Sequence, residues 1–412
     1  MTIPAPALAE AHDAALAARR LADLAMVRDL LDQDRPAVRE ILTNVATYAA
    51  AEYELDAARA ALDGAAAELA RHRPPTLRAS AVFMPSNMLL YSYVLYLLVP
   101  SLFVRRLAFR PSGHVREVTI ALHHRLAEAH RLPIELADLS QREFLREVVA
   151  PADLVVFTGR YANGTNIRSV LSAEQLFLYL GQGVNPVVVA PDADVERALT
   201  DTIGIRLFNS GQDCLGPDAI FVHDTVRDRF LDGLVARLSR LRPGPYTDPD
   251  ADYGPIHYDS ALEDVARFLH RYRSRIRHGG TVDFRARLVE PTVLVSELGA
   301  EPELTEFFAP VFNVVTFDDV DALRTTLTSG GYTDRALGAT VYGDADGTGR
   351  LTQALRKRHT GTVNEPLTAI DDGNAPFGGR GHIANHIAYR GRLHAEPILV
   401  SKAVADYWGV RP

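Results

Sequence analysis

The chain has 412 residues, of which 47% are hydrophobic and 23% charged, a composition typical of globular proteins and ample for two packed domains. The formal net charge of -8 disfavours nucleic-acid and anionic-membrane partners, because both require a basic surface. The single cysteine excludes an internal disulfide and a cysteine-rich metal site, and the 14 histidines show no pair at metal-ligand spacing beside a carboxylate, so we expect no metal. The first residues lack the pattern of a secretory signal, which predicts a cytoplasmic location.

Residues 1–72 are rich in Ala and Leu and predict helices, with a break at Asp-Arg-Pro (34–36) and an end at Arg-Pro-Pro (73–75). Strand and helix signals then alternate, with strands at 79–84, 107–109 and 154–157 and helices from 89 and over 115–130. A second series holds strands at 187–190 and 219–222 and helices at 194–208 and 225–241. The predicted fold class is therefore α/β, with two doubly wound units and a helical N-terminus.

The stretch 88–104 is uncharged and strongly apolar, which makes it the one candidate for a transmembrane helix. It is slightly too short for a span, contains Pro100, and is followed closely by Arg105, Arg106 and Arg110. We therefore predict a buried helix that leads into a buried strand, and no membrane association.

The only cysteine, Cys214, follows a predicted helix in a turn that contains Gly211 and precedes the strand near 218–222. This placement predicts a thiol exposed on a loop. A cysteine becomes a useful nucleophile when its thiol is accessible and its pKa is lowered, so Cys214 is the candidate nucleophile.

The segment 208–214, with the sequence FNSGQDC, resembles the catalytic-cysteine signature of the aldehyde dehydrogenase superfamily. Further segments that resemble family motifs follow the family's order across 79–385. These are 85–87 (PSN, the oxyanion-asparagine motif), 110–112 (RPS, the cofactor-ribose motif), 157–159 (FTG) with Gly164, 306–311 (EFFAPV), 363–364 (VN) and 376–379 (PFGG).

The resemblance implies a nicotinamide cofactor domain over 1–182 with its helical start at 1–72, a catalytic domain over 183–385, and a C-terminal return and oligomerisation segment over 386–412. It also implies that the Cys214 thiolate attacks a carbonyl carbon while the Asn87 amide and the Cys214 backbone N–H stabilise the oxyanion. Without the other motifs, Asn87 would be interpreted as a cap of the following helix.

The same resemblance implies a cofactor site. Glu306 would accept hydrogen bonds from the nicotinamide-ribose hydroxyls, and Gly159 and Gly164 would let the backbone approach the cofactor at a helix N-terminus. Arg160 stands where the family usually has a serine, so it either pairs with the pyrophosphate or obstructs the usual cofactor pose. The predicted cofactor-binding set is Arg110, Ser112, Phe157, Thr158, Gly159, Arg160, Gly164, Glu306 and Phe308.

Gly113 stands where NAD-preferring members often carry a glutamate that binds the adenosine ribose. Without the glutamate, no carboxylate repels a 2′-phosphate on the adenosine ribose. Candidate partners for this phosphate are Arg110, His114 and Arg116. We therefore expect NADP(H) in preference to NAD(H).

Hydrolytic members of the family carry a Glu-Leu-Gly-Gly segment whose glutamate activates water. The matching stretch here is 179–186 (YLGQGVNP), which puts Leu180 at the glutamate position, or Tyr179 if one residue is inserted. Neither side chain is a general base at neutral pH, since leucine accepts no proton and tyrosine titrates near pH ~10.

One face of the helix predicted after Asn87 carries Met88, Tyr91, Ser92 and Leu95. In the family this face lines the substrate tunnel, and the alternative is that these side chains pack in the core. With the two candidates for the base position, the predicted substrate pocket is Met88, Tyr91, Ser92, Leu95, Tyr179 and Leu180.

The missing base favours an NAD(P)H-dependent reductase that converts an acyl thioester of coenzyme A or a carrier protein to an aldehyde, or the reverse acylating oxidation. Two alternatives stay open: oxidation of an aldehyde to a carboxylic acid with a base from elsewhere in the chain, and a catalytically silent scaffold. The N-terminal part has no room for the family's oligomerisation hairpin, so a homodimer is expected.

Overall fold

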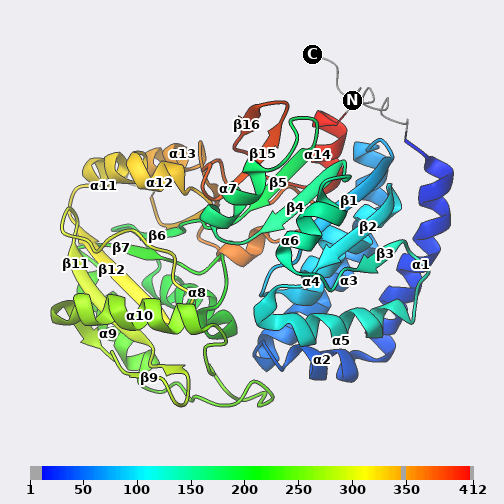
Figure 1. Ribbon diagram of the computed structural model, residues 1–412. Coiled ribbons are helices and arrows are strands. Elements are labelled where there is room, and N and C mark those ends of the chain that lie inside the picture. Colours follow the sequence, from blue (N-terminus) through cyan, green and yellow to red (C-terminus); the bar gives the residue numbers. More distant parts are fainter. Residues whose placement is uncertain (1–11, 345–348, 409–412) are drawn as a thin grey trace.

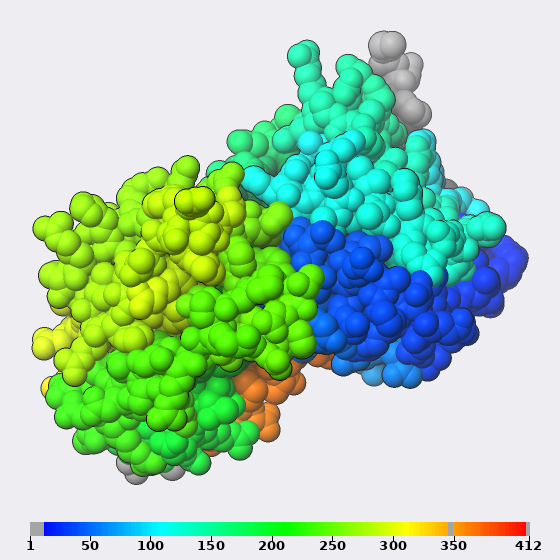
Figure 2. Space-filling view, turned by 90° about the horizontal axis from the view of Figure 1, so that it is seen from below, coloured from blue at the N-terminus to red at the C-terminus, as the bar shows by residue number. Residues whose placement is uncertain are grey.

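The computed structural model describes residues 12–344 and 349–408, and within them the chain forms two seven-stranded sheets of mostly parallel strands (Figure 1). The strand order is β16-β15-β5-β4-β1-β2-β3 in the first sheet and β14-β13-β6-β7-β12-β11-β8 in the second. Figure 2 shows the two groups as lobes, one coloured blue to cyan and the other green to yellow. The predicted α/β class with two such units is confirmed.

The first sheet has five parallel strands at its centre and one side, and two antiparallel strands from the C-terminal part complete its other edge. The parallel strands are β1 (Leu77–Phe83), β2 (Val104–Arg110), β3 (Ile134–Leu136), β4 (Leu154–Thr158) and β5 (Leu176–Leu180). The antiparallel pair is β15 (Asn385–Tyr389) and β16 (Arg392–His394), with β15 paired to β5. The central strands are buried along nearly all their length, as helices cover both faces of a parallel sheet.

Helices from residues 14–169 and one helix from the C-terminal part cover this sheet. They are α1 (Ala14–Gln33), α2 (Arg35–Leu42), α3 (Tyr48–His72), α5 (Arg116–Ala127), α6 (Gln141–Phe144), α7 (Tyr161–Ser169) and α14 (Val400–Tyr407). The Asp13 side chain caps α1, and α2 begins just before Pro36, whose missing N–H costs nothing in the first helical turn. The predicted break and end of the N-terminal helices both occur in the structure.

The apolar stretch 88–104 is a buried turn of helix that leads into β2. It consists of α4 (Leu89–Tyr93), a π-helical turn (Val94–Leu98), a 3₁₀ turn (Pro100–Leu102) and the start of the strand. No helix among the described residues is long and apolar enough to cross a membrane.

The chain leaves the first sheet after Leu180 and enters the second at Pro186. The second sheet contains β6 (Pro186–Val189), β7 (Ala219–His223), β8 (Ile276–His278), β11 (Thr292–Glu297), β12 (Val311–Phe317), β13 (Gly338–Tyr342) and β14 (Thr360–Val363), with β8 antiparallel to β11. Its helices are α8 (Val195–Leu207), α9 (Arg227–Leu238), α10 (Asp259–Arg271), α11 (Val320–Leu327), α12 (Gly330–Asp334) and α13 (Arg350–Leu355). A separate pair, β9 (Val282–Asp283) and β10 (Leu288–Val289), lies outside both sheets.

A buried carboxyl group on α3 holds the start of α4. Glu54 accepts hydrogen bonds from the backbone N–H groups of Leu90 (2.8 Å) and Tyr91 (3.3 Å). The residue at the N-cap, Met88, has a left-handed φ of 51° and caps nothing with its side chain, so the acceptor has to come from elsewhere. Burial, followed at some distance by the charge of Asp213, raises the pKa of Glu54 to about 8 against the two N–H groups that lower it.

Replacing Glu54 by Gln is expected to make the protein less sensitive to alkaline pH. A carboxyl group whose pKa is raised on folding stabilises the folded state fully below its unfolded pKa of 4.5, and loses that contribution as the pH rises through about 8. The melting temperature of the wild type should therefore fall more steeply from pH 6 to pH 9 than that of Glu54→Gln, by the equivalent of roughly 2–4 kcal/mol. Glu54→Leu, which removes the acceptor, should lose about 1–3 kcal/mol at both pH values. Parallel pH profiles for wild type and Glu54→Gln would contradict this role.

Candidate active site

A cavity of about 1040 Å³ opens between the two sheets and is lined by residues of both. Most of the predicted site residues meet there. They are Asn87, Arg110, Ser112, Phe157, Thr158, Gly159, Arg160, Leu180, Cys214, Glu306 and Phe308. Six predicted residues do not line this cavity: Met88, Tyr91, Ser92, Leu95, Gly164 and Tyr179.

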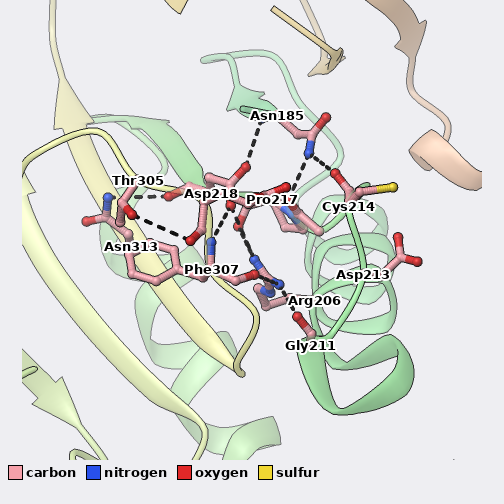
Figure 3. Close-up of polar contacts among 12 residues, drawn as sticks. Asn185, Arg206, Gly211, Asp213, Cys214, Pro217, Asp218, Thr305, Phe307 and Asn313 are labelled. Carbon is pink, nitrogen blue, oxygen red and sulfur yellow. Dashed lines mark hydrogen bonds and ion pairs between the residues drawn. The ribbon is translucent and has the colours of Figure 1, made fainter. Parts of the chain in front are cut away.

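Cys214 lies in the turn that joins α8 to β7. Two residues with left-handed backbones, Asn209 and Ser210, followed by Gly211 at φ 81°, make the chain reverse sharply before it. The side-chain amide of Asn185 donates to the carbonyl oxygen of Cys214 (2.7 Å), as Figure 3 shows, and to that of Gly216 (3.1 Å). The cysteine is thereby fixed through its own backbone.

The structure corrects the expectation of an exposed thiol with a lowered pKa. Cys214 is half-buried, and burial raises the pKa of its thiol well above the ordinary value. The negative charges of Asp213, Glu306 and Asp371 act in the same direction. The sequence pattern correctly indicates a turn, but the turn lies between the two sheets, where neighbouring segments cover it.

Asn87 faces the cysteine turn. Its side-chain Nδ2 donates to the carbonyl oxygen of Gln212 at 3.4 Å, two residues before Cys214. The cap interpretation is not borne out, because Met88 occupies the N-cap of α4 and Glu54 accepts the first N–H groups. An amide in this place can donate a hydrogen bond toward an oxygen atom that develops charge beside Cys214.

Glu306 lines the cavity from the segment without regular secondary structure that leads to β12. Burial raises the pKa of its carboxyl group well above the ordinary value, and the charge of Asp218 adds to this, while Arg206 and a backbone hydrogen bond from Gly183 oppose it. The neighbouring Phe307 is held on both sides of its peptide unit, since its N–H donates to Asp218 and its carbonyl oxygen accepts from Arg206.

The turn between β4 and α7 forms another wall of the cavity. Gly159 has φ 151°, and its carbonyl oxygen accepts a hydrogen bond from the Tyr179 hydroxyl at 3.0 Å. Arg160 bridges the two lobes, because its Nη2 donates to Ser260 (3.1 Å) and to Asp264 (3.4 Å) on α10. Arg160 thus has a partner across the cleft, and the N-terminus of α7 opens beside it.

The remaining candidate residues for the cofactor lie after β2. The Arg110 Nε donates to the Leu139 carbonyl oxygen (2.9 Å), and the Ser112 hydroxyl lies 2.7 Å from that of Ser86. Arg116 forms an ion pair with Asp138, so it is engaged on the surface. A Cβ added at Gly113 would meet nothing within 4 Å, which leaves open space at this position.

Comparison with known proteins identifies the family. Residues 132–394 match the aldehyde dehydrogenase family model. The chain belongs to the aldehyde dehydrogenase family. The match begins after Asn87 and Arg110, so the interpretation of those two residues depends on the geometry described above.

Among related sequences, the chain is 29% identical over 294 residues to 4,4'-diapolycopene-4,4'-dial dehydrogenase of Cytobacillus firmus, covering 70% of this chain and 62% of that protein. It is 30% identical over 171 residues to succinate-semialdehyde dehydrogenase [NADP(+)] 1 of Mycobacterium tuberculosis (strain ATCC 25618 / H37Rv), covering 40% of this chain and 37% of that protein. The chain therefore spans less than two thirds of these relatives.

Solved structures share the aldehyde dehydrogenase fold over nearly the whole chain. The succinic semialdehyde dehydrogenase of Streptococcus pyogenes in complex with NADP+ superposes with a TM-score of 0.81 at 17% identity, covering 94% of this chain and 91% of that one. A glyceraldehyde-3-phosphate dehydrogenase of Methanocaldococcus jannaschii complexed with NADP gives 0.80 at 19% identity, covering 95% and 87%.

The stretch that replaces the family's Glu-Leu-Gly-Gly segment presents leucine to the cavity. Leu180, the last residue of β5, lines the same cavity as Cys214. Tyr179 points to the other face, where it is fully buried and stacks on Phe157 with ring centroids 6.2 Å apart. A Cβ at Gly164 would lie 2.6 Å from the Tyr179 ring, so this glycine is explained by close packing of α7 and not by an approach to the cofactor.

The predicted substrate-tunnel face belongs to the core. Tyr91 and Ser92 are buried, and Met88 and Leu95 are partly buried against the same cluster. The hydroxyl of Tyr91 donates to Asp371 (2.9 Å), whose second oxygen accepts from Tyr53 (2.6 Å). The core-packing alternative therefore describes these four residues.

The helix presents Tyr96 to the cavity in their place. Residues Val94–Leu98 form a π-helical turn, which holds more residues per turn than an α-helix and so shifts the face on which later side chains lie. Counting at α-helical spacing could not have found Tyr96.

Proposed function

We propose that this chain is a nicotinamide-dependent oxidoreductase that interconverts an acyl thioester and an aldehyde through a thioester on Cys214. The observation that carries the proposal is that Leu180 faces the cavity of Cys214 from the position where hydrolytic family members have a glutamate. A thioester beside a leucine has no base there to activate water, so it persists until another thiol attacks it. Coenzyme A and the pantetheine of a carrier protein supply thiols of this kind.

The cavity suits a nicotinamide dinucleotide. Its volume of about 1040 Å³, the turn at Gly159, the N-terminus of α7 and the open space at Gly113 support such a ligand. Arg110, Thr158 and Glu306 would hold it, and Arg160 would exchange Asp264 for its pyrophosphate. When bound, the cofactor supplies or accepts the hydride.

In the reducing direction, the Cys214 sulfur would attack the carbonyl carbon of the acyl thioester, and the carrier sulfur would leave with the electron pair of the broken C–S bond. Because the pKa of Cys214 is raised, its thiol would lose its proton during this attack, and the proton would end on the departing carrier sulfur. The Asn87 amide and the Cys214 N–H would donate to the oxygen in each tetrahedral state. Hydride addition to the carbonyl carbon would leave a thiohemiacetal oxyanion on Cys214, which would collapse to the aldehyde and the Cys214 thiolate, and the thiolate would take up a proton. The acylating oxidation is the reverse of this sequence.

Oxidation of an aldehyde to an acid is the second candidate, and Glu306 favours it. This carboxyl group lines the cavity and influences the thiol electrostatically, and its raised pKa would suit a general base. In this alternative Glu306 would activate water in place of the missing glutamate.

The proposal is tested by the intact mass of the protein after incubation with an aldehyde panel and oxidised cofactor without added thiol. An acyl adduct that persists in water and disappears when coenzyme A is added supports the thioester-exchanging enzyme. Release of free acid without a lasting adduct supports the Glu306 alternative. Absence of both an adduct and cofactor reduction over a broad panel would instead indicate a scaffold without this activity.

We also propose a preference for NADP(H), tested by replacing Gly113 with Glu. The added carboxylate would enter open space near Arg110 and repel a 2′-phosphate, so binding of NADPH should weaken about 10-fold or more while binding of NADH changes little. Gly113→Gln has nearly the same size without the charge and is the matched control. Dissociation constants from cofactor fluorescence decide the outcome, and equal weakening for both cofactors would reject the preference.

A further inference from the structure

A buried ion pair lies directly beneath the Cys214 turn (Figure 3). Arg206, in the last turn of α8, and Asp218, just before β7, are both almost completely inaccessible, with Nη1 3.7 Å from Oδ1. The Arg206 guanidinium donates to three backbone carbonyl oxygens, those of Pro217 (3.1 Å), Gly211 (2.7 Å) and Phe307 (2.8 Å). It therefore joins both ends of the cysteine turn to the residue that follows Glu306.

Asp218 binds the same segments from the opposite side. Its Oδ1 accepts from the Phe307 N–H (2.9 Å) and its Oδ2 from the Asn185 N–H (3.1 Å). Asn185 in turn donates to the Cys214 carbonyl oxygen at 2.7 Å. Each partner of the ion pair thus contacts Phe307. Arg206 also binds the cysteine turn directly, and Asp218 is connected to it through Asn185.

The turn is shaped around the guanidinium. A Cβ added at Gly216 would lie 2.4 Å from the Arg206 Nη2, a distance that no side chain tolerates without displacing the group. Burying a guanidinium and a carboxylate costs a great deal of solvation free energy, and apolar side chains would fill the same space more favourably. The hydrogen bonds of this pair link two segments that carry cavity residues.

We infer that Arg206 and Asp218 form a positioning pair that holds the Cys214 turn in register with the Glu306 segment, so that the nucleophile and the cofactor-facing carboxylate stay aligned. The roles of Cys214 and Glu306 rest on the proposed function, whereas the alignment itself concerns only the two segments. The pair touches neither substrate nor cofactor and acts through the backbone of its neighbours.

Arg206→Lys separates alignment from charge. A lysine keeps the positive charge beside Asp218 and so keeps most of the stability, but one ammonium group cannot reach three carbonyl oxygens on two segments. We expect its melting temperature to stay well above that of Arg206→Met, while turnover falls about 10- to 100-fold. The rate at which iodoacetamide alkylates Cys214, the only cysteine, should also change at least about 3-fold, because the thiol moves relative to its neighbours.

Gly216→Ala serves as a second variant if Arg206→Lys fails to fold, because it displaces the guanidinium without altering any charge, and it should change alkylation and turnover in the same way. Gly204→Ala, on the same helix and with nothing within 4 Å of its added Cβ, is the matched control and should leave both unchanged. Wild-type alkylation and turnover in Gly216→Ala, or in a folded Arg206→Lys, would overturn the inference. Alkylation requires no acyl chemistry, so a wild type that alkylates normally but forms no acyl adduct would contradict the proposed function alone.

Discussion

Cys214→Ala is expected to lose cofactor-dependent turnover completely, by at least about 10⁴-fold, since no other side chain can replace a thiolate as the nucleophile. The chain has no second cysteine that could take over the reaction at low efficiency. Turnover is measured as reduction of the oxidised cofactor in the presence of an aldehyde and coenzyme A. The intact mass of the variant should show no acyl adduct under conditions that modify the wild type.

The control for this experiment is the binding of the cofactor alone. The cofactor would be held by other residues that line the cavity, among them Arg110, Gly159 and Glu306, and the substitution leaves these unchanged. The dissociation constant of Cys214→Ala for the cofactor should therefore lie within a few-fold of that of the wild type. Bound cofactor with no turnover would locate the defect in the chemical step. Residual turnover near the wild-type rate would exclude Cys214 as the nucleophile and with it both the reductive and the oxidative proposal.

Sequence patterns predicted the α/β class and several of the strands and helices, but not β5, the later strands of the second sheet or the antiparallel pair β15 and β16. The apolar run 187–190 and the amphipathic helix near 225–241 correspond to β6 and α9, since a buried parallel strand and a helix packed on a sheet have strong local signals. The break at Pro36 and the end near Pro74 correspond to the bounds of α2 and α3 because proline removes a donor.

The surroundings of the cysteine could not be predicted in this way, because they come from segments far apart in the chain. Glu54 and Arg206 lie on helices, where a charged side chain ordinarily indicates the solvent face, yet both are buried. Only the fold brings Glu54 to the start of α4 and Arg206 to the carbonyl oxygen of Phe307. The same long-range packing buries the Cys214 thiol and raises its pKa.

The helical N-terminal segment acquires a clear structural role from these contacts. It lies before the residues that match the family model, and its helix α3 supplies Glu54 to the first turn of α4. Thr47, at the N-cap of α3, donates its backbone N–H to the Oδ1 of Asn209 at 3.0 Å. This segment therefore supports both Asn87 and the cysteine turn from one side.

Under the proposed function, Leu180→Glu is expected to change the fate of the Cys214 adduct from thiol exchange to hydrolysis. The new carboxylate would face the cavity from the last residue of β5, and its partly buried, acidic surroundings would raise its pKa toward the range that suits a general base near neutral pH. Activation of water should shorten the lifetime of the Cys214 adduct by about 10²- to 10⁴-fold, the usual contribution of a positioned base. Time-resolved intact mass after rapid removal of free aldehyde measures this lifetime, and the acid is detected as the released product.

Leu180→Gln separates the base from the change in polarity, because glutamine has the shape of glutamate but accepts no proton at neutral pH. Its adduct should persist nearly as long as that of the wild type. Equal, short lifetimes in the two variants would mean that water entry and not base catalysis limits hydrolysis. If the adduct is already short-lived in the wild type and becomes long-lived in Glu306→Gln, the base is Glu306, and oxidation to the acid is favoured.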